Sequence, residues 1–398
     1  MKHAFVAFVI SLFVVTANAA TTWYVTKSGK DTNSGKSESA AFLTIQKAVD
    51  SSSAGDTVKV AAGTYAPITT SNKRIRIEST EGVAKTFIDG GGSKRCVTVG
   101  STTYNITTGV NPTEGTNTVI IGFTLRNGSA DYGGGCLCGS VDRCIITGCK
   151  AATQQGGGAF GGVLSNCLLV GNQSYSTGGG AASCTMSGCT VVGNTSRVAA
   201  GGLYRVTARN TLIAGNTGVS STYGEYKDCA LTSCYGSQNG SGNPKFADVG
   251  NGDYHLTSAS PCVNQGNNQW TVGDTDLDGN MRIAGDMVDI GCYEFGSSAP
   301  KLLTSVSAHP RYPWNGLVDV AFTMEGTSGT TYGVSFAAKD LAGGTNLTMK
   351  TLLKEDGTSA NASREQLFPG SYHWVWDAAA DCGAGFVGER IVIKVMTE

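Results

Sequence analysis

A unit of 22 to 23 residues recurs between residues 122 and 216 and restricts the fold of this chain more than any other feature. Each copy holds a short run of β-branched or aliphatic residues, most copies end in Gly-Asn, and glycine clusters separate them. The copies read GFTLRN at 122–127, CIITGC at 144–149, CLLVGN at 167–172, CTVVGN at 189–194 and TLIAGN at 211–216. So short a unit has no room for a pair of helices, and it predicts one coil of an all-β parallel solenoid.

Stacked coils place equivalent residues of the repeat above one another, at a spacing of about 4.8 Å. Asn172, Asn194 and Asn216 then form one column, with Asn127 below them and Cys149 interrupting the line. Asparagine side chains can bond along such a stack, and asparagine tolerates the positive φ of a bend between strands. We therefore predict a structural asparagine ladder.

A second column is predicted five residues earlier in the repeat and consists of Cys144, Cys167 and Cys189, with Thr211 next. In-register side chains of adjacent coils point in parallel rather than at one another, which disfavours disulfides between them. These cysteines are interpreted as small buried hydrophobic residues. The parity that faces the core stays open, because the copies at 122–127 and 144–149 favour opposite faces.

Residues 1–19 have the pattern of a secretory signal peptide. Lys2 and His3 precede an apolar run at 4–15, and residues 17–19 (Ala-Asn-Ala) match a small-x-small cleavage site. The run is shorter than the roughly 20 residues of a membrane-spanning helix, and no later stretch is apolar enough to span. The sequence therefore predicts a protein that is secreted or displayed on the cell surface, without a transmembrane segment.

The composition agrees with an exported all-β protein. Charged residues make up only 15% of the chain, while 56 residues are glycine and 40% are apolar. Loss of Lys2 with the leader leaves 28 basic and 30 acidic residues, a balance that gives no reason to expect nucleic acid or an anionic membrane as partner. The 13 cysteines are an odd number, so at least one thiol is unpaired in a monomer.

The segment at 23–65, WYVTKSGKDTNSGKSESAAFLTIQKAVDSSSAGDTVKVAAGTY, resembles the first segment of pectate-lyase-like right-handed β-helix proteins. In that family a short amphipathic helix covers the open end of the solenoid. Here Phe42, Ile45, Ala48 and Val49 provide the apolar stripe of such a helix. A cap of this kind is also expected physically, because an open end exposes core and strand edges.

Two later stretches, DYHLTSASPCVNQG at 253–266 and DTDLDGNMRIAGDMVDIGCYEF at 274–295, are similar to the closing segment of secreted β-helix proteins. The combined resemblance covers 22–296 and implies a right-handed single-stranded parallel β-helix domain over 20–296. The same fold hosts lyases, hydrolases, adhesins and inert scaffolds, so the resemblance is specific for fold and not for activity.

A linker at 297–300 separates this domain from a second one at 301–398. The stretch FPGSYHWVWDAAADCGAGFVGERIVIKV at 368–395 resembles the closing hairpin of immunoglobulin-like sandwich domains. Tyr372, Trp374 and Trp376 alternate in it, and core packing explains them better than a sugar-binding platform does.

The repetitive middle, 130–224, holds only two acids and no histidine. Polysaccharide-cleaving enzymes of this fold need clustered carboxylates, or carboxylates with an Arg or Lys base. If the chain is an enzyme, its candidate catalytic residues are Asp131, Arg143, Arg205 and Arg209. The alternative interpretation is that these four are solvated surface charges.

An ion motif and a disulfide are predicted near the end of the solenoid. Asp274, Asp276 and Asp278, followed by a glycine, resemble the first half of a calcium-binding loop, so we expect a structural Ca²⁺ there. The full loop pattern is incomplete, and an Asp- and Gly-rich turn is the alternative. Cys262 and Cys292 flank the closing segment and are the predicted disulfide.

The predicted function is binding or display by a non-catalytic β-helix protein, towards carbohydrate or a cell surface. The alternative is a polysaccharide lyase or glycoside hydrolase acting on an acidic polysaccharide. Aromatic residues on the turns offer sugar stacking, although they do not share one register of the repeat; they are Tyr132, Phe160, Tyr175, Tyr204, Tyr223 and Tyr226. The acid-poor middle favours binding.

Overall fold

The structure is a computed structural model that describes residues 20–100, 117–219, 223–236, 242–297, 303–311, 316–325, 331–340, 346–362, 365–383 and 391–397. The predicted signal peptide at 1–19 lies outside these residues. Contacts divide the chain into two compact units, Met1–Ser297 and Ser298–Glu398. Within the described ranges, no helix combines the length and the apolar character that crossing a membrane requires.

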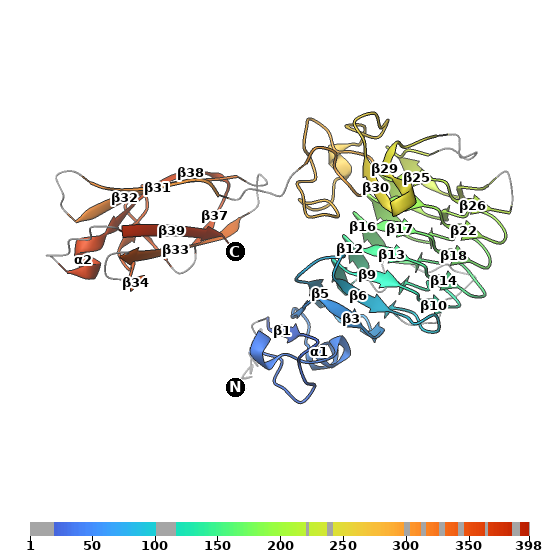
Figure 1. The fold of residues 1–398 in the computed structure, drawn as a ribbon, viewed down its shortest axis with the longest axis horizontal. Coiled ribbons are helices and arrows are strands. Elements are labelled where there is room, and N and C mark those ends of the chain that lie inside the picture. Colours follow the sequence, from blue (N-terminus) through green and yellow to red (C-terminus); the bar gives the residue numbers. More distant parts are fainter. Residues whose placement is uncertain are drawn as a thin grey trace, which may run out of the picture. The chain divides into compact units, whose positions relative to one another are not determined.

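The first unit is a parallel β-solenoid, which confirms the predicted fold class (Figure 1). Its strands form four parallel sheets, here called A to D. Sheet A consists of β1 (Thr22–Val25), β2 (Thr57–Val60), β5 (Arg76–Ser79), β8 (Val119–Ile121), β12 (Ser140–Asp142), β16 (Val163–Ser165), β20 (Thr185–Ser187), β24 (Thr207–Arg209) and β28 (Ala230–Thr232). Sheet B consists of β3 (Gly63–Tyr65), β6 (Thr86–Asp89), β9 (Thr124–Arg126), β13 (Ile145–Thr147), β17 (Leu168–Val170), β21 (Thr190–Val192) and β25 (Leu212–Ala214).

The other two sheets complete each coil. Sheet C consists of β4 (Ile68–Thr69), β7 (Val97–Thr98), β11 (Cys136–Leu137), β15 (Ala159–Phe160), β19 (Ala181–Ala182), β23 (Leu203–Tyr204) and β27 (Tyr226–Lys227). Sheet D consists of β10 (Ser129–Ala130), β14 (Lys150–Ala151), β18 (Gln173–Ser174), β22 (Thr195–Ser196) and β26 (Thr217–Gly218). In the middle of the solenoid the chain therefore visits the sheets in the order A, B, D and C before it starts the next coil.

The coils differ slightly in length, and this resolves the strand parity. In sheet B, Ile145 pairs with Thr124 and with Leu168, which are 21 and 23 residues away. Phe123 therefore lies in the same column as Cys144, and both are buried. Because this coil is 21 residues long, the equivalent side chains of the two copies that had favoured opposite faces point to the same face.

The same short coil makes the prediction for Asn127 wrong. Asn127 corresponds to Gly148, not to Asn172, and it is an exposed corner residue with a φ of 53°. Its side chain donates to the Asp89 carboxylate at 3.2 Å. Gly128 takes the place in the ladder that had been assigned to Asn127.

The rest of the ladder forms a directed chain of hydrogen bonds inside the solenoid. The backbone N–H and the side-chain amide of Asn172 donate to Oδ1 of Asn194 at 2.9 and 3.0 Å, and Asn194 donates twice in the same way to Asn216. Asn216 in turn donates both groups to Oε2 of Glu225 at 3.1 and 2.7 Å. Burial raises the pKa of Glu225, while the donors on Asn216 act in the opposite direction. Glu225 therefore ends the ladder.

The coil bends sharply at single residues with positive φ, called corners here. The corners between sheets A and B are Arg143, Asn166, Gly188, Asn210 and Ser233, and those between B and D include Gly148, Gly171, Gly193 and Gly215. At most of these corners the following residue donates a side-chain hydrogen bond to the carbonyl that precedes the corner. The pairs are Cys144 to Asp142, Cys167 to Ser165, Cys189 to Ser187, Thr211 to Arg209, Cys149 to Thr147, Asn194 to Val192 and Asn216 to Ala214.

The corner hydrogen bonds explain why the second column mixes cysteine with threonine. Cys144, Cys167 and Cys189 are completely buried and free, as interpreted, and Thr211 supplies the same donor in the next coil. Both residue types are small, and both carry a short donor that reaches back across the bend.

The predicted disulfide is wrong. Cys262 and Cys292 are both free and buried. Cys262 packs with Leu212 and Ile290, whereas Cys292 belongs to a different apolar cluster. None of the 13 cysteines, all of which lie within the described ranges, forms a disulfide, and ten of them are buried.

The N-terminal end of the solenoid is capped as predicted. Helix α1 (Ile45–Ser51) buries Ile45, Ala48 and Val49 against the first coil, and Phe42 packs beside them. Thr44 caps the helix by accepting from the backbone N–H of Lys47, and a short 3-10 helix, η1 (Glu38–Ala40), precedes it.

Sheet D belongs to a fin, defined as residues 129–135, 150–158, 173–180 and 195–202, whose loops project from the coils (Figure 1). Each loop runs out through a strand of sheet D and returns along a glycine cluster. A Cβ on Gly157 would lie 2.3 Å from the carbonyl oxygen of Gln173, and one on Gly179 would lie 2.2 Å from that of Thr195. The glycine clusters therefore allow the returning arm to pack directly on the next strand of sheet D.

The closing segment, 242–297, folds back over the outer face of sheet B. It contains β29 (Phe246–Asp248), η2 (Val249–Asn251), β30 (Asp253–Leu256) and η3 (Asn268–Trp270). Its side chains Leu277 and Tyr293 cluster with Leu168 and Val192, which point outward from sheet B. The outer face of sheet B is apolar in these coils because this segment covers it.

The second unit consists of two antiparallel sheets around one core. The first contains β31 (Leu303–Pro310), β32 (Leu317–Met324), β38 (Gly370–Asp377), β35 (Leu352–Leu353) and β36 (Ser359–Ala360), and the second β34 (Asn346–Leu347), β33 (Tyr332–Asp340), β37 (Glu365–Leu367) and β39 (Ile391–Thr397). A short helix, α2 (Ala378–Cys382), follows β38. Trp374 and Trp376 are buried in this core, which confirms the packing interpretation. The immunoglobulin-like topology stays a prediction.

The corner hydrogen bond can be tested at Thr211, which is fully buried and donates to Arg209 at 2.8 Å. We expect Thr211→Val to destabilise the solenoid by about 1 kcal/mol, because it keeps the shape and removes the donor. Thr211→Cys should lower the free energy of unfolding by less, since cysteine occupies the equivalent position in earlier coils. Chemical unfolding of the full chain measures both, and equal losses would contradict the proposed role of the donor.

Candidate functional site

Arg143 and Arg209, two of the predicted catalytic residues, anchor the closing segment. Arg143 donates to Asp142 at 3.0 Å and to the hydroxyl of Thr275 at 2.7 Å. The guanidinium of Arg209 lies 4.1 Å from the centre of the Trp270 ring. Both side chains are therefore engaged in holding this segment on the solenoid.

The other two members of the set lie elsewhere. Asp131 is on the fin, where it accepts a hydrogen bond from the hydroxyl of Thr153 at 2.7 Å. Arg205 occupies a corner between sheets C and A, with its guanidinium 5.1 Å from the centre of the Tyr204 ring. The structure does not bring Asp131, Arg143, Arg205 and Arg209 into one site, because the repeat distributes them over different corners and sheets.

The predicted calcium ligands do not converge either. Asp276 is buried, and its carboxylate accepts backbone N–H bonds from Asp278, Asn280 and Glu294 at 2.8 to 3.1 Å. Asp278 pairs with a histidine instead, and Asp274 is exposed. Among the described residues, no three His, Cys, Asp or Glu side chains are placed to hold a metal ion. The motif forms a turn that its own amides stabilise.

Charged side chains of the closing motif form a buried network. Arg282 pairs with Glu294 at 2.7 Å, and the two side chains are 2% and 1% exposed. Arg282 also donates to the Asn166 side chain at 3.1 Å, which ties the closing segment to a corner of the solenoid. Glu294 accepts further bonds from the backbone of Ala284 and Asp289. This motif therefore has a structural role in docking.

His255 links two parts of the closing segment. Its Nδ1 lies 2.5 Å from a carboxylate oxygen of Asp253, and its Nε2 lies 2.6 Å from one of Asp278. The imidazole also packs on the ring of Tyr293, with the centres 3.9 Å apart. Hydrogen bonding to Asp278, and then to Asp253, raises the pKa of His255 to about 9, so the ring is charged at neutral pH.

The exposed outer face of sheet D is the remaining candidate site. Its strands stack in register, so Lys150, Gln173 and Thr195 form one outward column. Tyr175 and Arg197 lie two residues further along their coils, on the same face. The guanidinium of Arg197 lies 5.4 Å from the centre of the Tyr175 ring.

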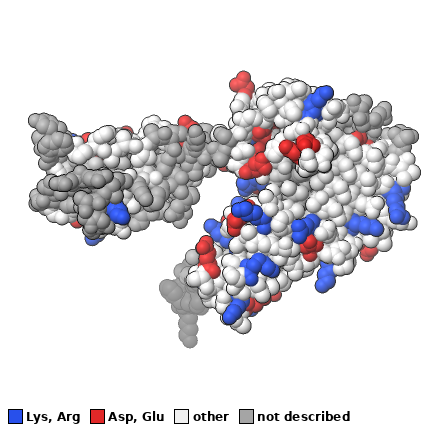
Figure 2. All heavy atoms as spheres, in the orientation of Figure 1, with Lys and Arg blue, Asp and Glu red and all other residues white. Residues whose placement is uncertain are grey.

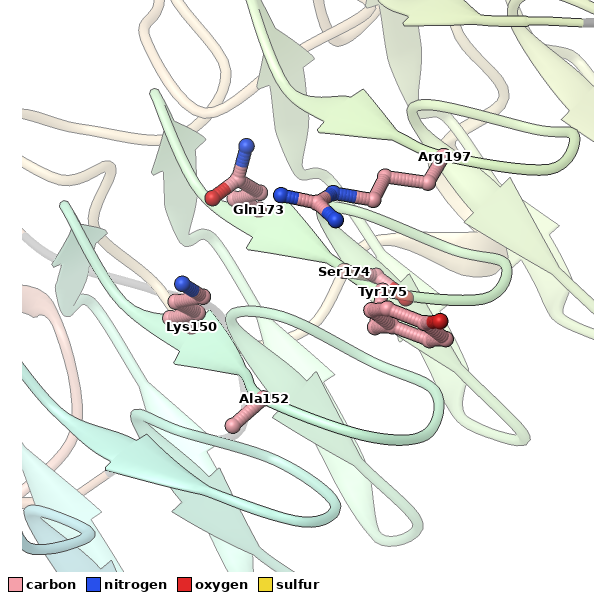
Figure 3. Close-up of a pocket in the computed structure, with 6 residues that line it drawn as sticks. All are labelled: Lys150, Ala152, Gln173, Ser174, Tyr175 and Arg197. Atoms are coloured by element: carbon pink, nitrogen blue, oxygen red, sulfur yellow. The ribbon is translucent and has the colours of Figure 1, made fainter.

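These residues line a pocket of about 190 Å³. Figure 3 shows that Lys150, Gln173 and Arg197 extend from successive strands towards the same opening, with Tyr175 beside Arg197. The lining residues are Lys150, Ala152, Gln173, Ser174, Tyr175 and Arg197. The pocket thus carries two cations, one amide and one phenol ring, and no acidic lining residue.

The charge distribution favours this face for an anionic ligand. In Figure 2, acidic side chains gather over the closing segment, whereas Lys and Arg are spread over the coils. Lys150 and Arg197 are both exposed, and the one acid on the fin, Asp131, lies in the preceding coil. The fin therefore presents positive charge to solvent.

The sequence analysis singled out Tyr175 among the turn aromatics and did not group it with Lys150 or Arg197. Of the turn aromatics, Phe160 and Tyr204 are buried, while Tyr175 is 51% exposed. The register of the repeat is the signal that could have found this site. Cys149 and Asn172 occupy equivalent places in the repeat, so the residues that follow them, Lys150 and Gln173, are also equivalent.

Comparison with known proteins gives structural neighbours only. No family model matches the chain, and no curated protein matches it. The solved neighbours include pectate lyase Pel9A (12% identity, 70% of this chain and 97% of that one, TM-score 0.28) and a rhamnogalacturonan lyase (16% identity, 55% and 63%, TM-score 0.29). A third is XylC in complex with xylose (10% identity, 89% and 99%, TM-score 0.25). The function of the sheet D site is therefore inferred from its own residues.

The His255 contacts predict a pH-dependent stability of the docked closing segment. Because the folded pKa of about 9 lies above the usual 6.5, the stabilisation is complete below pH 6.5 and disappears as the pH rises through 9. At pH values below 6.5 we expect the His255→Gln variant to have a lower unfolding midpoint than the parent protein. Above pH 9 the two midpoints should be the same. His309→Gln, at an exposed position of the second unit, is the control. A difference that does not change with pH would contradict the assignment.

Proposed function

We propose that this protein is exported and binds an anionic polysaccharide on the outer face of sheet D. The observation that carries the proposal is the pocket in which Lys150 and Arg197 flank Gln173 and Tyr175 on stacked strands. Export rests on the signal-peptide pattern of residues 1–19. The solenoid itself acts as a rigid support for this surface.

The chemistry of the pocket suits an acidic sugar polymer. An ammonium and a guanidinium attract carboxylate or sulfate groups, and Arg197 can bind such a group through two parallel hydrogen bonds. The amide of Gln173 matches sugar hydroxyls as donor and acceptor, and the ring of Tyr175 offers an apolar face. Lys150, Gln173, Tyr175 and Arg197 are exposed, so the pocket can be reached by a polymer lying across the strands.

Binding explains these residues better than hydrolysis does. Hydrolysis of a glycosidic bond uses a pair of carboxyl groups at the scissile bond. None of the six lining residues carries a carboxyl or an imidazole group. Lysis or hydrolysis of an acidic polysaccharide is the competing function, and the same experiment decides between the two.

We expect Lys150→Ala and Arg197→Ala each to weaken binding of an anionic polysaccharide by about tenfold or more, because each removes a charge-assisted hydrogen bond. Calorimetric titration of the purified chain against acidic and neutral oligosaccharides measures this. The affinity should also fall as salt is added, because the charges are exposed.

Lys59→Ala is the matched control, since Lys59 is an exposed lysine on a solenoid strand of sheet A. It removes the same charge and should leave binding unchanged. Absence of binding to any acidic glycan, or an equal loss in Lys59→Ala, would overturn the proposal. Reducing ends and unsaturated-uronide absorbance are followed in parallel, and cleavage abolished by Lys150→Ala would replace binding with catalysis.

A further inference from the structure

Tyr175 and Arg197 occupy equivalent places in adjacent coils of the fin. The backbone N–H of Tyr175 donates to the carbonyl of Ala151 at 2.9 Å. The backbone N–H of Arg197 donates to the carbonyl of Ser174 at 3.2 Å. These bonds continue the register of sheet D, in which Ser174 pairs with Ala151 and with Ser196. The side chains of Tyr175 and Arg197 therefore leave the same face of the fin, one coil apart.

The Arg197 side chain lies back over the coil that contains Tyr175. Its guanidinium carbon is 5.4 Å from the centre of the Tyr175 ring, within the range in which the face of an aromatic ring attracts a cation. Figure 3 shows the side chain running from its own strand towards Gln173 and Tyr175. Within the part of the chain that the structure describes, no carboxylate pairs with Arg197, so the Tyr175 ring is the contact that stabilises its charge.

The other forces on Arg197 do not favour its place at the pocket. Lys150 lines the same pocket and carries the same charge, and like charges repel. A long exposed arginine side chain also has many rotamers, and fixing one of them on binding costs conformational entropy. Attraction to the Tyr175 ring opposes both effects, because it keeps the guanidinium at the pocket before a ligand binds.

Resting on the proposed function, we infer that Tyr175 is a positioning residue for anion binding. Its ring holds the Arg197 guanidinium at the opening that Lys150 also lines, where the two cations face an acidic group of the polysaccharide. Most of the contribution of Tyr175 to the affinity therefore passes through Arg197. Direct stacking of the ring on a sugar is the competing role, and it does not depend on Arg197.

Calorimetric titration of the full chain with an acidic oligosaccharide tests this role through a double-mutant cycle, at low salt so that the weaker variants still bind. We expect Tyr175→Leu to weaken binding about threefold to fivefold, the size of an exposed cation–aromatic contact. Tyr175→Phe keeps the ring face and should bind as tightly as the parent protein. In the Arg197→Ala background, Tyr175→Leu should have almost no further effect, because the group that Tyr175 positions is gone.

Tyr223→Leu is the matched control. Tyr223 lies between β26 and β27 and is 39% exposed, against 51% for Tyr175. The ammonium of Lys227 lies 5.3 Å from the centre of the Tyr223 ring, so the two residues form the same kind of pair. Tyr223 is not among the residues that line the pocket, and Tyr223→Leu should leave the affinity unchanged.

The outcomes separate this inference from the proposed function. If the parent protein binds no acidic oligosaccharide, the proposed function fails and the inference fails with it. If Tyr175→Leu weakens binding equally with and without Arg197, the ring contacts the sugar directly and the positioning role is wrong, while anion binding stands. The role is also wrong if Tyr175→Leu has no effect or if Tyr175→Phe loses as much affinity. A loss that phenylalanine rescues and that disappears in the Arg197→Ala background supports the inference.

Discussion

The solenoid depends on how its chain turns a corner. A single residue with positive φ bends the backbone, and the next side chain donates a hydrogen bond to the carbonyl that precedes the bend. That carbonyl also accepts a backbone N–H from the preceding coil. Cys189, Thr211 and Asn194 perform this task at different corners with a thiol, a hydroxyl and an amide. Both columns of the repeat therefore place a small side-chain donor directly after a bend, where its hydrogen bond adds to the backbone bond that the same carbonyl accepts.

The closing segment covers the outer face of sheet B, whereas the outer face of sheet D stays exposed on the fin. The closing segment holds itself on sheet B through apolar contacts and on the corners through the buried Arg282–Glu294 pair and the Arg209–Trp270 stack. The closing segment does not cover sheet D, because sheet D lies on the fin, which projects from the coils. Its glycine clusters make that possible, since the returning backbone packs where no side chain would fit.

The repeat predicted the fold well because register, corner chemistry and glycine spacing are local properties of each coil. It failed at Asn127, where one coil is a residue short and the pattern shifts by one place. It failed more widely for charged side chains, since their positions depend on which sheet each strand joins. The acids of the closing motif suggested calcium, yet Asp276 serves its own backbone amides, a contact that residue spacing alone does not reveal.

Specificity on a repeating support has to come from departures from the repeat. The inward positions are nearly uniform, as the asparagine ladder requires, and a uniform outer face would bind every position of a polymer equally. On sheet D the outward column instead changes from Lys150 to Gln173 to Thr195 between strands that are otherwise equivalent. Because the backbone spacing is constant, the coils differ on this face through these side chains and through Tyr175 and Arg197, which lie two residues further along. The regular coils keep the spacing of positions on this face constant, and the exposed side chains differ from coil to coil.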